Sequence, residues 1–473
     1  MAKTKIVATL GPQSESVEII EKMIDAGVDV FRINFSHQTH KEQVLRMNIV
    51  RRASRRLDKP VAILADLQGP KIRTGRIAEE AKPVILKDGQ RFAITTEEVL
   101  GDNKRVSTDF RQITTNVGPG DSILINDGKL RLDVDAVVGA EVRCTVCVGG
   151  ELGERKGINI PGKKISLGSH GSMTDKDRRD LAFSLEQNVD YVALSFVRDA
   201  EDVRFLRALI GQANEATPII AKIETPLAVQ NIDEILNECE GIMVARGDMG
   251  VELAVEEVPL RQKELIEKAA MKHKLCITAT QMLESMIENS TPTRAEASDI
   301  ANAIFDGTDA IMLSGETAVG KYVVESVATM RRIADMADSS QYVRRFDNQL
   351  DPDSVNIALA TASAAISACA EAEAAAIVVF TMTGKTALLI SKLRPEVPVL
   401  ALTPEERTCR RLALQNGVTP VLNLWERNAL PDIEVGLQRL RSMSMINAGA
   451  RIVLVSGEIP EAGHSNSIKI VSV

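Results

Sequence analysis

Lys222 and Glu224 form a pair of residues whose types and spacing could do chemistry. They lie two positions apart at the end of the apolar run IIAKIET, and residues two apart in a β-strand point to the same face. Asp248 follows the next apolar run, GIMVARG, and supplies a second carboxylate. Two carboxylates suit a Mg²⁺ ion that keeps water and substrate oxygens as its other ligands. Lys222 and Glu224 could instead form only an ion pair.

Cationic residues occupy similar positions in the sequence. Arg32 lies in the run VFRINFS, and Arg73 follows the run VAILADL. If these residues and Lys222 converge, they suit a substrate with phosphate and carboxylate groups. Phosphoryl transfer needs this kind of site, because the enzyme must neutralise spread anionic charge and does little covalent work itself. The sequence therefore favours a phosphoryl-transfer enzyme.

A second anion-binding signal follows the run IVVF near the C-terminal end. Hydroxyls, a glycine and a lysine stand there before the helix-like segment ALLISKL, an arrangement that can bind a phosphate at a helix N-terminus. A P-loop would need a glycine in place of Val379, so this segment is not one. An ordinary hydroxyl-capped helix start is the alternative. The residues of this predicted effector-phosphate loop are Thr381, Thr383, Gly384, Lys385 and Thr386.

The elements that must position these residues are short apolar runs, which alternate with segments of helical periodicity. Near-continuous apolar runs are typical of parallel strands buried on both faces. Eight of them predict a (β/α)₈ TIM barrel, whose active site forms at the carboxyl ends of the strands. The runs are KIVATLG, VFRINFS, VAILADL, YVALSFV, IIAKIET, GIMVARG, LCITATQ and AIMLSGE.

Two further regions break this alternation. Between the third and fourth runs, turns rich in Gly, Asp and Pro separate short alternating segments such as SILIN, which predicts a small β domain inserted as a lid at the barrel mouth. Towards the C-terminus, three apolar runs alternate with helices, as in an open α/β domain. We therefore expect an α/β protein with a barrel at 1–69 and 170–341, a β lid at 70–169 and a C-terminal domain at 342–473.

Composition narrows the class of protein. Apolar residues make up 44% and charged residues 26%, as in globular proteins. A net charge of −8 and an aromatic content of 3% give no drive towards nucleic acid or anionic membranes. We find no signal-peptide or membrane-spanning segment. Six cysteines without a disulfide or zinc pattern indicate a reducing compartment, so we expect the cytoplasm.

Nine segments occur in the same order as in pyruvate kinases, and the sequence resembles that family over all three regions. They are TKIVATLGP, FRINFSH, DLQGPKIRTG, ERKGINIPG, AKIET, MVARGDMGVE, TATQMLESMI, PTRAEASD and IMLSGETAVGKY. The resemblance implies phosphoryl transfer from phosphoenolpyruvate to ADP, giving pyruvate and ATP in the last step of glycolysis. It also implies Mg²⁺ or Mn²⁺, a regulatory C-terminal domain that binds a phosphorylated metabolite, and a homotetramer.

The resemblance assigns roles around the predicted metal. Lys222 resembles the lysine that stabilises the transferring phosphoryl group and the enolate, and Glu224 and Asp248 resemble the metal ligands. The amides of Gly247 and Asp248, with the Thr280 hydroxyl, would hold the substrate carboxylate. Thr280 with a nearby water is the expected route for the proton that reaches the enolate.

The resemblance also assigns a nucleotide side. Arg32 and Arg73 would meet phosphates, Arg32 as part of the substrate site. The residues implied on the nucleotide side are Asn34, His37, Arg73 and Lys156, the last of them in the lid.

This sequence departs from many family members at Leu67 and Lys71, where Thr and Glu are common. Both lie at the monovalent-cation site, which would otherwise be formed by Asn34, Ser36, Asp66 and the carbonyl of Leu67. A lysine ammonium can supply the charge of K⁺, so we expect that K⁺ is not required. Lys71 could alternatively be a solvated residue at the hinge to the lid.

Two other functions fit the barrel. One is a Mg²⁺-dependent aldolase or lyase that acts on pyruvate enolates, and the other is an inactive metabolite sensor. The aldolase would not need a lid, nucleotide-side residues or a phosphate loop. The sensor would be expected to have lost Lys222, Glu224 or Asp248, and all three are present.

Overall fold

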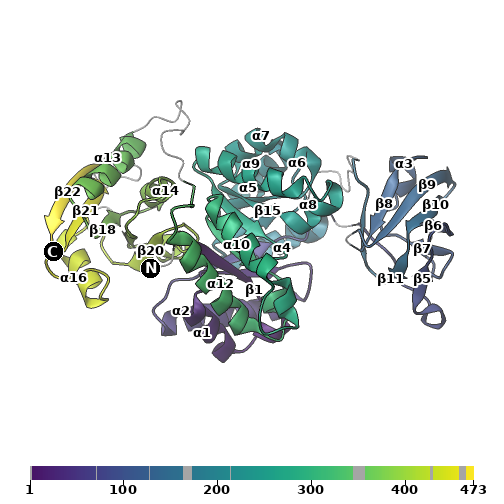
Figure 1. The fold of residues 1–473 in the computed structure, drawn as a ribbon, viewed down its shortest axis with the longest axis horizontal. Coiled ribbons are helices and arrows are strands. Elements are labelled where there is room, and N and C mark those ends of the chain that lie inside the picture. The colour runs from purple at the N-terminus through teal and green to yellow at the C-terminus, as the bar shows by residue number, and fades with distance from the viewer. Residues whose placement is uncertain are drawn as a thin grey trace.

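The computed structural model describes residues 3–70, 72–126, 128–162, 173–213, 215–344, 357–426, 430–457 and 465–473. Figure 1 shows three bodies in a row, with a barrel between the inserted region and the C-terminal region. Separate clusters of buried apolar side chains lie in each. The predicted fold class is therefore confirmed: a closed parallel barrel, an inserted β region and an open α/β sheet.

The barrel strands are the eight apolar runs that the sequence predicted. They close in the order β1-β17-β16-β15-β14-β13-β3-β2, and all but β2 are buried at every residue. Burial on both faces explains why the runs are almost wholly apolar. Their bounds are β1 (Lys5–Thr9), β2 (Val30–Asn34), β3 (Ala62–Asp66), β13 (Tyr191–Leu194), β14 (Ile219–Ile223), β15 (Gly241–Ala245), β16 (Leu275–Ala279) and β17 (Ala310–Leu313).

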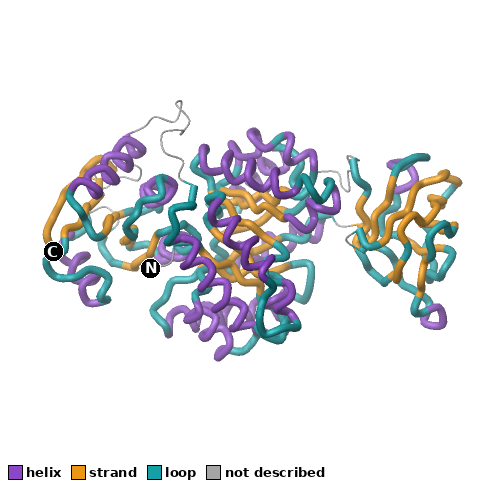
Figure 2. Tube along the Cα trace, in the orientation of Figure 1, coloured by secondary structure: helices purple, strands orange, loops and turns teal. Residues whose placement is uncertain are grey.

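Helices surround the barrel strands, as Figure 2 shows. Thr39, Thr174 and Thr293 begin three of them with capping boxes, in which the hydroxyl and the acid three residues later exchange hydrogen bonds with the backbone. The helices are η1 (Pro12–Ser14), α1 (Val17–Ala26), α2 (His40–Arg56), α4 (Asp175–Glu186), α5 (Ala200–Gln212), α6 (Pro226–Gln230), α7 (Ile232–Glu238), α8 (Arg246–Glu252), α9 (Val258–Met271), η3 (Glu284–Ile287), α10 (Arg294–Phe305), α11 (Gly315–Ala318) and α12 (Val323–Asp338).

The inserted region is mostly strand and loop (Figure 2). Its seven-stranded sheet has the order β4-β12-β8-β9-β10-β6-β7, and β11 pairs with β5. Asn159 donates to Glu252 of α8 at 2.9 Å, across to the barrel. The elements are β4 (Ile72–Arg73), η2 (Glu79–Ala81), β5 (Val84–Leu86), β6 (Arg91–Thr95), β7 (Arg105–Ser107), α3 (Ile113–Asn116), β8 (Ser122–Ile125), β9 (Leu130–Val138), β10 (Glu141–Val148), β11 (Gly150–Leu152) and β12 (Gly157–Asn159).

The C-terminal region has a five-stranded sheet with the order β20-β19-β18-β21-β22, in which only the β21–β22 pair is antiparallel. Buried Asp309, just before β17, pairs with Lys392 and Arg394 of this region and so ties it to the barrel. The elements are α13 (Ile357–Glu371), β18 (Ala376–Phe380), α14 (Lys385–Lys392), β19 (Val399–Thr403), α15 (Glu406–Leu412), β20 (Val418–Leu422), α16 (Ile433–Ser442), β21 (Arg451–Gly457) and β22 (Ser465–Ser472).

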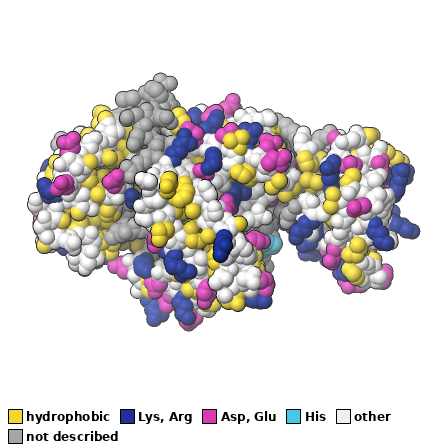
Figure 3. All heavy atoms as spheres, viewed as in Figure 1, with side chains coloured by type: hydrophobic (Ala, Val, Ile, Leu, Met, Phe, Trp, Pro, Cys, Tyr) yellow, Lys and Arg dark blue, Asp and Glu magenta, His cyan; other side chains and the backbone are white. Residues whose placement is uncertain are grey.

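The visible face of the barrel carries charged side chains of both signs, which Figure 3 shows scattered over the surface. Among the described residues, none of the helices combines the length and the apolar character that crossing a membrane would require.

Candidate active site

The carboxyl ends of four barrel strands bring charged side chains into one buried cluster. The Lys222 ammonium lies 2.9 Å from a Glu224 oxygen and 3.5 Å from an Asp66 oxygen, and it donates to the Ser195 hydroxyl at 2.8 Å. Arg32 donates to the other Asp66 oxygen at 2.6 Å. These residues come from β14, β3, the end of β13 and β2, so the cluster lies where the sequence predicted an active site.

The charges in this cluster shift one another's ionisation. Burial opposes the charged form of Asp66, but Lys222 and Arg32 outweigh it and hold the pKa of Asp66 below its usual value. Burial also opposes the charge of Lys222, yet Asp66 and Glu224 together raise the pKa of the ammonium. Lys222 therefore stays protonated at neutral pH, as its predicted role in neutralising anionic charge requires.

The donors beside Lys222 fit a divalent cation. Burial and the nearby Asp248 raise the pKa of Glu224, even though Lys222 acts in the opposite direction. A divalent cation at this place would favour the charged form of Glu224, which burial and Asp248 oppose. Among the described residues there is no group of three or more His, Cys, Asp or Glu placed to hold a metal. Glu224 and Asp248 remain the predicted protein ligands, with the other ligands from substrate and water.

Thr280 and Gly247 lie in contact next to this cluster. The Gly247 amide donates to the Thr280 hydroxyl at 2.8 Å, and that hydroxyl donates to the Ala279 carbonyl at 2.6 Å. Thr280 has a φ of 70°, a value that is costly for a β-branched residue, and Gln281 has a φ of 55°. Arg246 stabilises the turn by donating to the Thr280 carbonyl at 2.7 Å. Two of the three predicted carboxylate-binding groups, the Gly247 amide and the Thr280 hydroxyl, therefore lie in contact.

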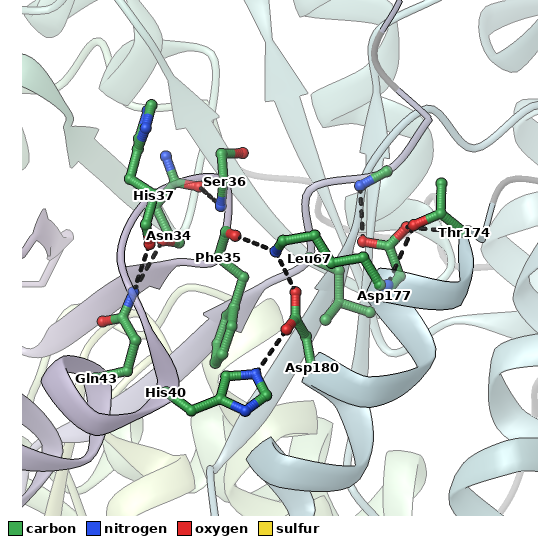
Figure 4. Close-up of polar contacts among 12 residues, drawn as sticks. Asn34, Phe35, Ser36, His37, His40, Gln43, Leu67, Thr174, Asp177 and Asp180 are labelled. Carbon is green, nitrogen blue, oxygen red and sulfur yellow. Dashed lines mark hydrogen bonds and ion pairs between the residues drawn. The ribbon is translucent and has the colours of Figure 1, made fainter. Parts of the chain in front are cut away.

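The loop after β2 carries predicted nucleotide and cation residues (Figure 4). The Asn34 side-chain oxygen accepts from the Ser36 amide at 2.9 Å. Gln43 of α2 donates to the carbonyls of Asn34 and His37, each at 3.1 Å. The backbone of the loop is thus fixed at both ends.

The predicted monovalent-cation site is described only in part. The Leu67 carbonyl accepts from the Ser195 hydroxyl at 2.7 Å, and the Phe35 amide donates to the Asp66 carbonyl at 3.0 Å. The strand ends of β2 and β3 are therefore joined at this point. Lys71 lies outside the described residues.

Arg73 and Lys156 both lie in the inserted region. The Arg73 guanidinium donates to the Arg155 carbonyl at 3.1 Å, and the Lys156 amide donates to the Thr74 hydroxyl at 2.8 Å. Among the described residues, no hydrogen bond or ion pair links Arg73 or Lys156 to the cluster around Lys222. Their roles stay predictions.

The predicted effector loop precedes α14. The Gly384 amide donates to the buried Thr381 hydroxyl at 2.9 Å, and Gly384 has a φ of 82°. Thr383 and Lys385 are exposed, whereas Thr386 is buried. Lys385 also lines a cavity of about 240 Å³ between α14 and the barrel, together with Lys272 and Lys274. The last two lysines add positive charge that the sequence did not associate with the loop.

Ser195 is the member of the cluster that sequence reasoning missed. It directly follows β13, in the run YVALSFV, and a polar residue at that place was the signal available. Glu316, at the end of the eighth run, is instead structural: it is buried and accepts from the Leu283 amide at 3.0 Å and the Ser314 amide at 2.7 Å.

Comparison with known proteins gives matches over most of the chain. The family model for the barrel domain of pyruvate kinase matches residues 1–327, and that for the pyruvate kinase alpha/beta domain matches 359–471. The pyruvate kinase of Thermotoga maritima is 42% identical over 473 residues, which is 100% of both chains. That of Clostridium acetobutylicum is 42% identical over 99% of both, and that of Geobacillus stearothermophilus is 43% identical over 99% of this chain and 80% of the relative.

Proposed function

This chain belongs to the pyruvate kinase family, and from that premise we propose which residues carry the reaction. The enzyme is a phosphotransferase that binds phosphoenolpyruvate and ADP and forms pyruvate and ATP, and the family generally uses Mg²⁺. The observation that carries the proposal is the buried Lys222 ammonium, which lies between Glu224 and Asp66 at the barrel mouth.

Lys222 stabilises the charge that moves during transfer. The bond between the phosphorus and the enol oxygen breaks, an ADP oxygen forms the new bond to phosphorus, and the electron pair stays on the enolate oxygen. A fixed ammonium beside that oxygen favours the transition state, because it needs no reorganisation during the step. Ser195 and the two carboxylates hold the ammonium in place.

The groups around Thr280 orient the substrate and lead the proton to it. The amides of Gly247 and Asp248 and the Thr280 hydroxyl would bind the carboxylate, in exchange for the present bond from Gly247 to Thr280. The enolate carbon then takes a proton through Thr280 and a water, which gives pyruvate. Glu224 and Asp248 would hold the Mg²⁺ or Mn²⁺ ion, which supplies positive charge at the transferring phosphoryl group.

The nucleotide side is formed by Asn34 and His37 in the barrel and by Arg73 and Lys156 in the lid, and Arg32 lies beside it as part of the substrate site. Asp66 holds the Arg32 guanidinium at one end, and Arg32 also donates to the Thr9 hydroxyl at 3.0 Å. The lid residues would reach the nucleotide when the inserted region, 70–169, covers the mouth. The barrel, 1–69 and 170–341, and the C-terminal domain, 342–473, complete the proposed division of the chain.

The test of this function is pyruvate formation from phosphoenolpyruvate, followed with and without ADP in the presence of Mg²⁺. A phosphotransferase requires ADP and forms ATP in equal amount. An aldolase or lyase would instead consume pyruvate with an aldehyde and ignore ADP, and a sensor would bind ligands without turnover. Release of pyruvate without ADP would contradict the proposal.

We expect activity without K⁺, which is our first prediction. Oxygens of the monovalent-cation site already have donors within the protein: Asn34 accepts from Ser36, the Leu67 carbonyl from Ser195, and Asp66 from Arg32. With Lys71 as a covalent positive charge, KCl should change kcat less than about twofold in tetramethylammonium buffer of constant ionic strength. A stimulation of about tenfold or more would refute the prediction.

The matched variant is Lys71→Glu. It removes the proposed replacement for K⁺, so activity in K⁺-free buffer should fall, and KCl should recover part of it. Recovery would stay incomplete because Leu67 keeps its side chain where the family often has Thr. Equal activity of both proteins in K⁺-free buffer would show that Lys71 is only a solvated hinge residue.

An activating phosphate is expected to bind the loop of Thr381 to Thr386, held by its hydroxyls, by Lys385 and by the N-terminus of α14. Thr383→Ala with Lys385→Ala should abolish activation and leave basal kcat within about twofold, since neither residue lies near Lys222. A screen of sugar bisphosphates, sugar monophosphates and AMP on both proteins measures this. Undiminished activation of the double variant would place the effector elsewhere.

We also propose a homotetramer in the cytoplasm. Two exposed apolar surfaces support the assembly. One lies at the start of α9, where Val255 is 75% and Leu260 57% exposed, and the other at the edge strand β22, where Ile470 is 53% exposed. An unpaired edge strand can also pair with a strand of a second chain. The six free cysteines are consistent with a reducing compartment.

A further inference from the structure

Lys176 connects the helix after the inserted region to the loop that follows β2. It lies in the first turn of α4, and Figure 4 shows that turn facing the loop from Asn34 to His37. Its ammonium donates to the Phe35 carbonyl at 2.5 Å and pairs with Asp180 at 2.6 Å. Phe35 lies between Asn34 and Ser36, which carry the predicted cation and nucleotide contacts. Lys176 therefore contacts the backbone of the predicted site rather than its side chains.

The contact of Lys176 acts on a single peptide group. The Phe35 carbonyl and the Ser36 amide belong to the same planar unit, and that amide donates to the Asn34 side-chain oxygen at 2.9 Å. The ammonium, the peptide and the Asn34 amide thus form one chain of hydrogen bonds, in which each bond polarises the next. The ammonium and the Asn34 side chain are therefore linked through a single peptide group.

The surroundings of Lys176 hold it in place. The Asp180 carboxylate, only 4% exposed, also accepts a hydrogen bond from the His40 ring nitrogen Nε2 at 2.7 Å. The His40 ring stacks on Phe183 with centroids 4.2 Å apart, and the Phe35 ring meets both edge-on at 6.2 and 6.1 Å. The same loop is thus held by a hydrogen bond from Lys176 to the Phe35 carbonyl and by contacts of the Phe35 ring with His40 and Phe183.

The neighbouring Asp177 links this turn to the start of the inserted region. One of its oxygens accepts from the Gly69 amide at 3.0 Å, and the other accepts from the Thr174 hydroxyl at 2.6 Å. Gly69 has a φ of 70°, and a Cβ there would lie 2.8 Å from the Ser195 side chain. The first turn of α4 therefore holds both the point where the chain leaves the barrel and the loop after β2.

We propose that Lys176 is a positioning residue for phosphoryl transfer, which sets the orientation of Asn34 towards the nucleotide through the peptide of Phe35 and Ser36. The proposal depends on the assignment of Asn34 and His37 to the nucleotide side. It leaves Lys222 and the substrate-carboxylate groups unaffected, because none of the contacts of Lys176 reaches them. Loss of the ammonium should thus affect ADP more than phosphoenolpyruvate.

Steady-state kinetics of Lys176→Met with each substrate varied in turn test this. The KM for ADP should rise about tenfold, whereas the KM for phosphoenolpyruvate should change less than about twofold. Lys176→Arg should restore most of the ADP affinity, because a guanidinium can also donate to the carbonyl and pair with Asp180. The control is Lys263→Met, which removes a half-exposed lysine paired with the largely buried Asp306 on the outside of the barrel and should leave both KM values unchanged.

Other outcomes would overturn the proposal. An unchanged KM for ADP in Lys176→Met, or equal rises in both KM values with no rescue by arginine, would show a purely structural role. If the methionine variant does not fold, Lys176→Gln keeps a donor without the charge, and the same preferential rise for ADP is expected. Lys222→Met measured in parallel separates the two ideas, because an active Lys222→Met would refute the proposed function and leave the ADP effect of Lys176 unaffected.

Discussion

Lys222→Met is expected to lower kcat by about a thousandfold or more, with KM values for both substrates changed less than about tenfold. The reason is that the ammonium meets its strongest negative charge only in the transition state, when the enolate oxygen becomes the leaving group. In the ground state, Glu224 and Asp66 already balance its charge. Initial-rate kinetics with purified enzyme and saturating Mg²⁺ give both parameters.

A second buried lysine of the barrel provides the control. Lys5 is 7% exposed in its side chain, lies 3.6 Å from Asp29, and donates to the Val418 carbonyl at 2.8 Å, at the opposite end of the strands. Lys5→Met should lower the melting temperature but leave kcat within about threefold, since it removes a buried partner far from the reaction. Turnover of Lys222→Met close to that of Lys5→Met would show that Lys222 is structural too.

Glu224→Gln is expected to raise the Mg²⁺ concentration for half-maximal activity by at least about tenfold, and to lower kcat at any metal concentration that can be reached. The amide keeps the size of the side chain and could still accept from the Phe196 amide, which now donates to Glu224 at 2.7 Å. It loses the charge that a divalent cation needs. Activity measured over a series of MgCl₂ and MnCl₂ concentrations gives the shift.

Glu316→Gln is the matched control for the metal prediction. Glu316 lies in α11, just after β17, is buried like Glu224, and binds only backbone amides in the described structure. Its replacement should change stability without a change in the metal requirement. If the Glu224→Gln and wild-type metal curves coincide, Glu224 is not a ligand and the paired carboxylates are structural.

The strands were predictable because a barrel strand buried on both faces must be apolar at nearly every position. The alternation of side chains along a strand predicted that Lys222 and Glu224 would share a face, and the 2.9 Å contact between them confirms it. Contacts between distant segments were not predictable in this way. Ser195 reaches Lys222, and Lys176 reaches the Phe35 carbonyl, only because the helices and strands pack as they do.

The backbone conformation of turns and the position of the inserted region cannot be predicted from the pattern of apolar residues. The positive φ of Thr280 follows from the turn that Arg246 stabilises, not from the preference of threonine. The placement of Arg73 depends on how the inserted region sits on the barrel, which a local motif cannot define. The cationic residues in and after the predicted strands thus indicated the kind of site but did not identify all of its residues.

The most direct test of the account is ³¹P NMR of phosphoenolpyruvate, ADP and Mg²⁺ with the wild-type enzyme and with Lys222→Met. The account predicts that the phosphoenolpyruvate signal of the wild-type reaction disappears as the γ-phosphate signal of ATP grows in equal amount. Inorganic phosphate should stay at its starting level, and the variant sample should be unchanged over the same period. Transfer by the variant at a rate near that of the wild type, or release of inorganic phosphate in place of ATP, would contradict it.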